Sequence, residues 1–192
     1  MMVLCILLAM LSLFLLLKLI YQRRLVRKIK KQIDFLTELF KKAKAMGINT
    51  TLDTSANPFT DKEPWHSKWL ELMKYTDLVL LDIKQINEQE HVKLTGQTNQ
   101  NILAMARELS DMNKPVWIRH VLVPGGSDKD EYLHQLADFI QTLGNARRVE
   151  VLPYHTLGTF KWEKLGIPYP LEGVKPPTQE RIDNARRILN AI

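Results

Sequence analysis

Four apolar runs that alternate with helical patterns constrain the fold of this chain more than any other feature. The runs are candidate β-strands at residues 48–56, 77–84, 115–123 and 149–152. Continuous apolar strands separated by helices are typical of a parallel sheet that helices cover. With 192 residues, the chain has room for half of a β/α barrel. We therefore predict an α/β fold, a partial (half) β/α barrel with parallel strands.

Apolar residues at helical spacing predict the helices around these strands. The first helix covers residues 33–43 and is capped by Gly47. Further helices are predicted at residues 65–75, 88–94, 101–111 and 128–143, with a turn at residues 124–127. Thr178 follows two prolines and is the predicted N-cap of a last amphipathic helix.

The positive charge of the chain is confined to its first 31 residues. The chain has 27 Lys and Arg against 21 Asp and Glu, a formal charge of +6. Seven of the basic residues and none of the acidic ones lie in residues 1–31, so the other residues carry 20 basic and 21 acidic groups. A nearly neutral body disfavours a nucleic-acid partner. We therefore divide the chain into a head (residues 1–31) and a body (residues 32–192).

The head has two interpretations that the sequence leaves open. Residues 2–21 are almost entirely apolar, long enough for an N-terminal helix that spans a bilayer, and basic residues follow them. Such an order predicts a membrane anchor with the body in the cytoplasm. The other interpretation is a non-native leader, joined to the body by truncation or a shifted reading frame.

The cysteine content and the lack of several common motifs exclude several kinds of site. The single cysteine, Cys5, lies in the head, so the body has no thiol for a disulfide or a multi-cysteine metal site. The common glycine-rich nucleotide motifs, the paired-histidine zinc motif and the EF-hand motif are not found in the sequence.

Polar residues gather where the predicted strands end. They are Asp53, Asp82, Lys84, Arg119 and His155. The carboxyl ends of parallel strands converge on one cleft, and Asp82 and Lys84 point to the same face of their strand. A cleft with both signs of charge predicts a zwitterionic small molecule as ligand.

The other histidines are not predicted to belong to this cleft. His66, His91 and His134 show no metal-ligand spacing, so we expect them at the solvated surface. His120 alternates with Arg119 along its strand and is expected to face the outer helix layer.

Several stretches of the body resemble one known family, in order and at compatible spacing. They are LDTS (52–55), TDLVLLDIK (76–84), VWIR (116–119), VPGGSD (123–128), LPYHTLG (152–158) and GVKPP (173–177). From about Gln32 onward the chain closely resembles the C-terminal two-thirds of the pyruvate formate-lyase activating enzymes. These belong to the radical S-adenosylmethionine superfamily and to its branch that activates glycyl radical enzymes.

The resemblance implies a fold, cofactors and partners. The fold would be a partial β/α barrel of six strands, of which this chain supplies the last four. In the family, a 4Fe–4S cluster reduced by a flavodoxin-type donor cleaves S-adenosylmethionine, and the resulting radical takes hydrogen from a glycine of pyruvate formate-lyase. The implied S-adenosylmethionine-binding residues are Asp82, Ile83, Lys84, Arg119, Val121, Leu152 and His155. The implied monovalent-cation site comprises Asp53, Thr54, Leu80 and Asp82.

The chain departs from the family at the cluster. The family's Cys-x-x-x-Cys-x-x-Cys loop supplies three thiolates to the cluster, and no counterpart exists in this sequence. No catalytic residue and no iron–sulfur ligand is therefore assigned, and we expect the chain to be truncated and inactive alone. Two alternatives stay open: a membrane-tethered protein that keeps a degraded S-adenosylmethionine or partner surface, and a β/α-barrel enzyme that uses the charged cleft without a radical.

Overall fold

The computed structural model describes residues 32–57 and 59–191 of the chain. The predicted apolar N-terminal helix, its membrane insertion and the cytoplasmic orientation drawn from it all concern residues outside these ranges. Within the described ranges, no helix combines the length and apolarity needed to cross a membrane.

The described residues fall into two compact units. One comprises residues 32–50 with 61–76, and the other comprises residues 51–57 and 59–60 with 77–191. The sequence was divided only between the head and the body, so this further division was not predicted.

The first unit contains two helices. Residues 32–45 form one helix, and α2 (Trp65–Lys74) is the other. Gly47 has a φ of +73° and ends the first helix as predicted, with Ile48 N–H donating to the Ala43 carbonyl oxygen at 2.9 Å. This is the left-handed cap that favours glycine. Lys68 of α2 forms an ion pair with Asp34 of the first helix.

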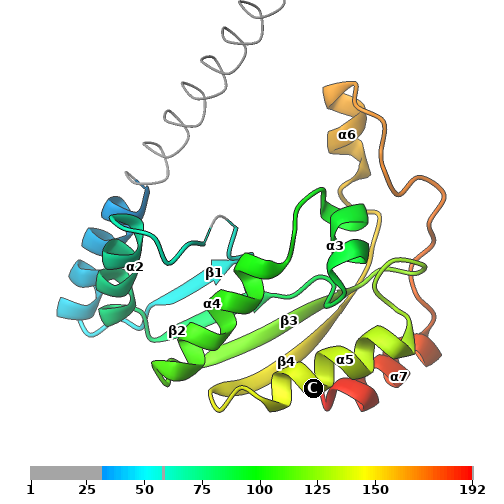
Figure 1. The fold of residues 1–192 in the computed structure, drawn as a ribbon. Helices are drawn as coiled ribbons and strands as arrows, with labels where there is room; N and C mark the ends of the chain where they lie inside the picture. The colour runs from blue at the N-terminus through cyan, green and yellow to red at the C-terminus, as the bar shows by residue number, and fades with distance from the viewer. Residues whose placement is uncertain (1–31, 58, 192) are drawn as a thin grey trace, which may run out of the picture. The chain divides into compact units, whose positions relative to one another are not determined.

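The second unit is built on a parallel sheet, in agreement with the predicted fold class (Figure 1). Its strands are β1 (Thr51–Thr54), β2 (Leu78–Asp82), β3 (Val116–Leu122) and β4 (Ala146–Pro153), in the order β1-β2-β3-β4. Each strand pairs in parallel with the next along the chain. All four carboxyl ends therefore lie at one edge of the sheet.

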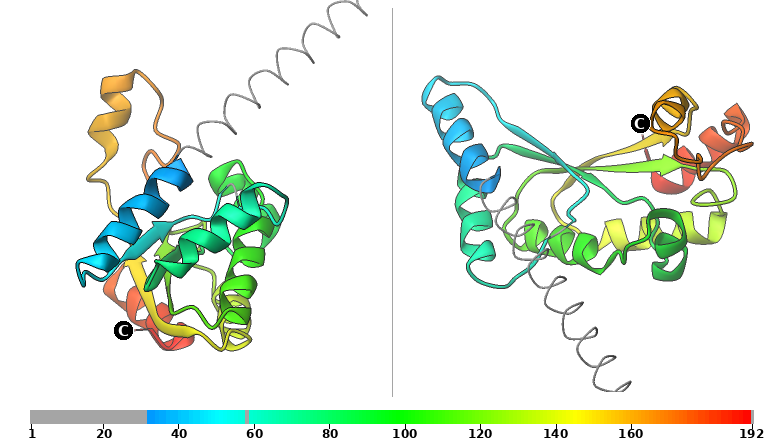
Figure 2. Two further views of the ribbon diagram at one scale, coloured as in Figure 1. Left: turned by 90° about the vertical axis from the view of Figure 1, so that its left-hand side faces the viewer. Right: turned by 90° about the horizontal axis from the view of Figure 1, so that it is seen from above.

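Helices of the second unit cover one face of this sheet. The helices of this unit are α3 (Glu88–Thr95), α4 (Gln100–Asp111), α5 (Asp130–Gln141), α6 (Thr159–Leu165) and α7 (Gln179–Leu189), of which α6 does not pack on the sheet. Helices α4 and α5 lie along the same face, and α7 packs against α5 and β4 (Figures 1 and 2). Side chains alternate along the strands, so Val116, Ile118 and Leu122 of β3 are buried, whereas Trp117 and Arg119 are half-buried. The half-buried face carries the charged residues of the sheet.

One sequence prediction about the helices was wrong, and one helix was missed. His91 was expected at the solvated surface, but it is buried in α3, with Nδ1 2.8 Å from the Gln97 carbonyl oxygen. The left-handed turn at Gly96 ends α3 and brings this carbonyl back toward the ring. Helix α6 was not predicted at all, because it is seven residues long and buries none of its own side chains.

Candidate functional site

An ion-pair network joins the carboxyl ends of β1, β2 and β3. Arg119 lies directly opposite Asp82 in the register of β2 and β3, and its Nε donates to Asp82 Oδ1 at 2.9 Å. Its Nη1 donates to Asp53 Oδ2 at 2.9 Å, and its Nη2 bonds to the other Asp53 oxygen. Lys84 Nζ donates to Asp82 Oδ2 at 3.0 Å. The predicted pairing of Asp82 with Lys84 is therefore present.

The two aspartates stabilise the charged form of Arg119. Burial by itself lowers the pKa of the Arg119 guanidinium, but hydrogen bonds and ion pairs with Asp53 and Asp82 outweigh burial and raise the pKa above its ordinary value. Side-chain exposure is only 17% for Arg119 and 16% for Asp82, against 35% for Lys84. Lys84 is thus the cation of this network with the most room for a ligand.

A pocket of about 410 Å³ lies beside the network, at the ends of β2, β3 and β4. We call it the strand-end pocket. Four of the predicted cofactor-binding residues line it: Lys84, Val121, Leu152 and His155. Lys84 therefore contributes both to the pocket wall and to the ion-pair network.

Asp82, Arg119 and Ile83 complete the predicted cofactor set but do not line this pocket. Asp82 and Arg119 are tied to it through Lys84. Ile83 is fully buried, and its backbone N–H donates to the Arg119 carbonyl oxygen at 2.9 Å.

The four residues predicted for a monovalent-cation site do not all lie on one face of the sheet. Asp53 and Asp82 lie on the half-buried face of the sheet, and both bond to Arg119. Thr54 alternates to the other face, and its Oγ1 accepts from Ala56 N–H at 2.9 Å. Leu80 is the register partner of Asp53. Among the described residues, no group of three or more His, Cys, Asp or Glu side chains is placed to hold a metal ion, so the cation site stays a prediction.

A buried polar cluster behind the pocket fixes the loops that carry its wall. We define the cluster as Gln85, Asn99, His120 and Ser127, all almost fully buried. Gln85 Nε2 donates to the Gly126 carbonyl oxygen at 2.9 Å, and Asn99 Nδ2 donates to the Gln85 and Ile86 carbonyl oxygens at 3.1 and 2.6 Å. The cluster ties the loop after β2, which contains Lys84, to the loop after β3.

His120 is the central bridge of this cluster and faces the helix layer, as predicted. Its Nδ1 lies 2.8 Å from the Ile83 carbonyl oxygen and its Nε2 lies 3.1 Å from that of Ser127. Burial lowers the pKa of His120 below its ordinary value, although the two backbone contacts oppose the shift. A neutral imidazole has one N–H, so it donates to only one of the two carbonyl groups at neutral pH.

Sequence reasoning missed the part of the pocket that α3 and the loop after α6 supply. Leu94, Thr95, Tyr169 and Leu171 line it with the predicted residues. Tyr169 Oη lies 2.8 Å from Tyr154 Oη, and this hydrogen bond, more than burial, raises the pKa of Tyr169 to about 12. Tyr154 lies next to His155 in the LPYH stretch, and this position was the sequence signal that could have identified Tyr154 as a pocket residue. For Tyr169, no periodicity in the sequence gives such a signal.

Curated relatives match most of this chain. It is 57% identical over 159 residues to a pyruvate formate-lyase-activating enzyme of Streptococcus mutans, and this match covers 83% of the chain and 60% of the relative. The enzymes of that name from Staphylococcus epidermidis and Listeria monocytogenes are 53% and 49% identical, with 63% and 64% of their lengths covered. The chain thus spans less than two thirds of the length of these relatives. No family model matches the chain.

A solved structure supports the fold. A domain of pyruvate-formate lyase-activating enzyme from Bacteroides vulgatus superposes with a TM-score of 0.66 at 21% identity, over 83% of this chain and 86% of that domain. At this identity, the likeness concerns the fold alone. Over most of its length, at 49–57% identity, the chain is a relative of the pyruvate formate-lyase-activating enzymes.

Proposed function

We propose that the body is the S-adenosylmethionine-binding and substrate-facing part of a pyruvate formate-lyase-activating enzyme. The observation that carries the proposal is the strand-end pocket, where Lys84, Val121, Leu152 and His155 meet beside the Asp82–Arg119 ion pair. The relatives' name supports the same reading. When bound to a reduced cluster, S-adenosylmethionine supplies the 5′-deoxyadenosyl radical of this reaction class.

The residues present fit the chemistry of S-adenosylmethionine. The Lys84 ammonium would pair with the methionine carboxylate, and Asp82, whose Oδ2 accepts from Lys84, would orient this ammonium from beside the pocket. Val121 and Leu152 would provide apolar contacts for the adenosyl group. Arg119 would hold the Asp82 carboxylate in place, and Ile83 would contribute through its backbone only, because its side chain is buried.

The residues present do not fit the cluster. Three thiolates are needed, and these 192 residues contain one cysteine, Cys5. We therefore assign no radical step to these residues, and the flavodoxin-type donor finds no electron acceptor among them. Anaerobic reconstitution of this chain with iron and sulfide is expected to yield no 4Fe–4S signal in visible absorbance or electron paramagnetic resonance. Stoichiometric cluster uptake would contradict this part of the proposal.

Binding of S-adenosylmethionine to the full chain tests the proposal without any turnover. Isothermal titration calorimetry should detect one site per chain. Asp82→Asn removes a charged acceptor and should weaken binding roughly tenfold, a loss of about 1.4 kcal/mol. Asp138→Asn is the matched control, since Asp138 is an exposed carboxylate on α5, and it should leave the affinity unchanged. Absence of binding by the wild-type chain, or equal affinities of the Asp82→Asn variant and the wild type, would overturn the proposal.

A further inference from the structure

Helix α6 contributes no side chain to a hydrophobic core. It comprises seven residues, and none of its side chains is buried. In Figure 1 it stands away from the sheet, beyond the carboxyl end of β4. A helix this short is not stable in water by itself, so the surface of α6 is suited to a partner that covers it.

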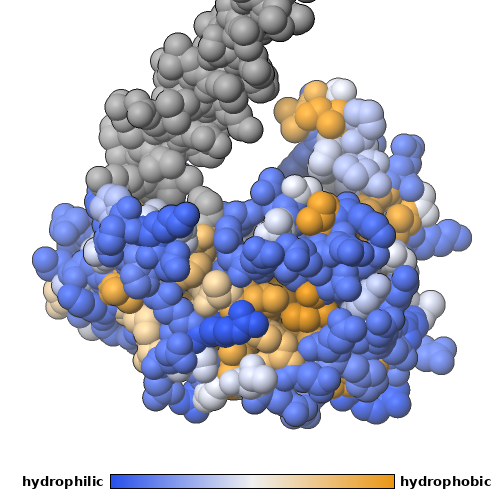
Figure 3. Space-filling view, viewed as in Figure 1, coloured by the Kyte–Doolittle hydropathy of each residue, from blue (hydrophilic) through white to orange (hydrophobic). Residues whose placement is uncertain are grey.

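Large apolar side chains are exposed on α6 and at its two ends. Leu157 is 77% exposed and Leu165 is 71% exposed, and Phe160 and Ile167 are about half exposed. We call these four residues the α6 patch. Figure 3 shows hydrophobic side chains gathered at the outer end of α6. Clustered exposed apolar groups of this kind mark interaction sites in soluble domains.

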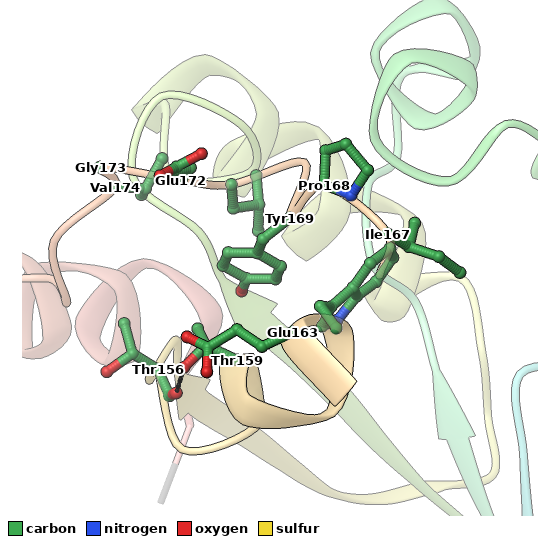
Figure 4. A pocket seen from close by; sticks show the side chains of 11 residues that line it. Thr156, Thr159, Glu163, Ile167, Pro168, Tyr169, Glu172, Gly173 and Val174 are labelled. Carbon is green, nitrogen blue, oxygen red and sulfur yellow. Dashed lines mark hydrogen bonds between the residues drawn. The ribbon is translucent and has the colours of Figure 1, made fainter. Parts of the chain in front are cut away.

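The α6 patch continues into a second pocket. This pocket of about 390 Å³ lies between α6 and residues 167–174 (Figure 4). The rings of Trp162 and Tyr169 lie 5.6 Å apart in its wall. Tyr169 and Leu171 line both this pocket and the strand-end pocket. The exposed apolar surface and the proposed cofactor site are therefore adjacent.

We propose that the α6 patch receives the polypeptide substrate, the glycine-bearing segment of a glycyl radical enzyme. The inference rests on the proposed function. Hydrogen abstraction requires the reacting atoms to be within about 3–3.5 Å, so the glycine has to reach the strand-end pocket. The chain on either side of that glycine then lies on the surface next to the pocket, and the α6 patch is the exposed apolar surface there.

Charged side chains of α6 surround the apolar side chains of the patch. Lys164 Nζ and Lys161 Nζ lie 5.4 and 6.0 Å from the centroid of the Phe160 ring. Glu163 lies between these lysines on α6 and lines the adjoining pocket. The patch thus has an apolar centre and a rim with charges of both signs, which is the usual arrangement of a protein interface. The segment that binds here presents apolar side chains to the α6 patch.

The experiment compares two double variants of the full chain. Leu157→Glu with Leu165→Glu places charges in the α6 patch. Phe35→Glu with Met46→Glu is the matched control in the first unit, where these side chains are 66% and 74% exposed. All four positions are exposed, so both variants should fold, and urea unfolding checks this. The probe is immobilised, non-activated pyruvate formate-lyase, and S-adenosylmethionine binding is measured in parallel.

The α6 variant should bind pyruvate formate-lyase at least roughly tenfold more weakly than the wild type. Its affinity for S-adenosylmethionine should stay unchanged, and the control variant should match the wild type in both assays. Unchanged binding of pyruvate formate-lyase by the α6 variant would overturn this inference alone, and so would an equal loss in the control. If sedimentation showed that the α6 variant dissociates a dimer of the chain, a second copy would cover the patch and the inference would fail. Absence of S-adenosylmethionine binding by the wild type would instead overturn the proposed function.

Discussion

Replacing His120 by phenylalanine tests the buried polar cluster that supports the strand-end pocket. The ring bridges the Ile83 and Ser127 carbonyl oxygens at 2.8 and 3.1 Å and is almost fully buried. Phenylalanine fills a similar volume but donates no hydrogen bond. Since the neutral imidazole donates only one, one buried carbonyl loses its donor, which costs about 1–3 kcal/mol of the free energy of unfolding.

The same substitution has a predicted pH dependence. The pKa of His120 is lowered in the folded protein, so below about pH 6.5 the unfolded chain binds a proton that the folded chain does not. The contribution of His120 to stability is therefore complete above that pH and falls by up to about 1.4 kcal/mol per pH unit as the pH drops toward the folded pKa. The variant lacks this contribution, so its difference from the wild type should shrink between pH 7.5 and pH 5.5.

Urea unfolding at these two pH values, followed by tryptophan fluorescence, measures both effects. His134→Phe is the control, because His134 is exposed on α5 and its replacement should leave the stability at pH 7.5 unchanged. Equal stability of the His120→Phe variant and the wild type at pH 7.5 would refute the role of the bridge. A difference that grows toward pH 5.5 would show that the folded protein prefers the imidazolium, with protons on both nitrogens, and would refute the direction of the pKa shift.

Three further substitutions test separate contacts. Arg119→Lys removes the planar fork that reaches two carboxylates, so S-adenosylmethionine binding measured by calorimetry should weaken roughly tenfold, and an unchanged affinity would contradict the role of the network. Tyr169→Phe should remove a phenol that titrates at about 12 in an ultraviolet pH titration; a wild type in which no phenol titrates that high would contradict the hydrogen bond to Tyr154. Thr178→Ala removes the side chain that caps α7 and should cost about 1 kcal/mol in urea unfolding, whereas Thr178→Ser should retain most of it; equal losses in both would argue against the cap.

The elements that bury an apolar face were predictable from the sequence. Periodicity predicted helices at residues 65–75 and 101–111, and the structure has α2 at Trp65–Lys74 and α4 at Gln100–Asp111. The N-cap at Thr178 was predicted from local chemistry alone, and its side chain accepts from Arg181 N–H. Helix α6 was not predictable in this way, because a helix without a buried face shows no apolar periodicity in the sequence.

The sequence was enough to predict which strand ends carry the candidate site, but not how all of its side chains bond to one another. Alternation along one strand is enough to pair Asp82 with Lys84, and the shared edge of a parallel sheet brings Arg119 and His155 near them. The double attachment of Arg119 to Asp53 and Asp82 depends on the register of three strands, which the sequence does not specify. The burial of His91 depends on the path of the chain after Gly96, and the contribution of Tyr169 depends on a loop that folds back over the strand ends.

Hydrogen–deuterium exchange of the full chain with and without S-adenosylmethionine tests the central claim most directly, because it locates the ligand on the sequence. We predict slower exchange at residues 82–86, 121–123 and 152–155, which border the strand-end pocket, and no change at residues 32–45. No protection at the strand ends, or protection confined to another part of the chain, would contradict the assignment of this pocket to S-adenosylmethionine.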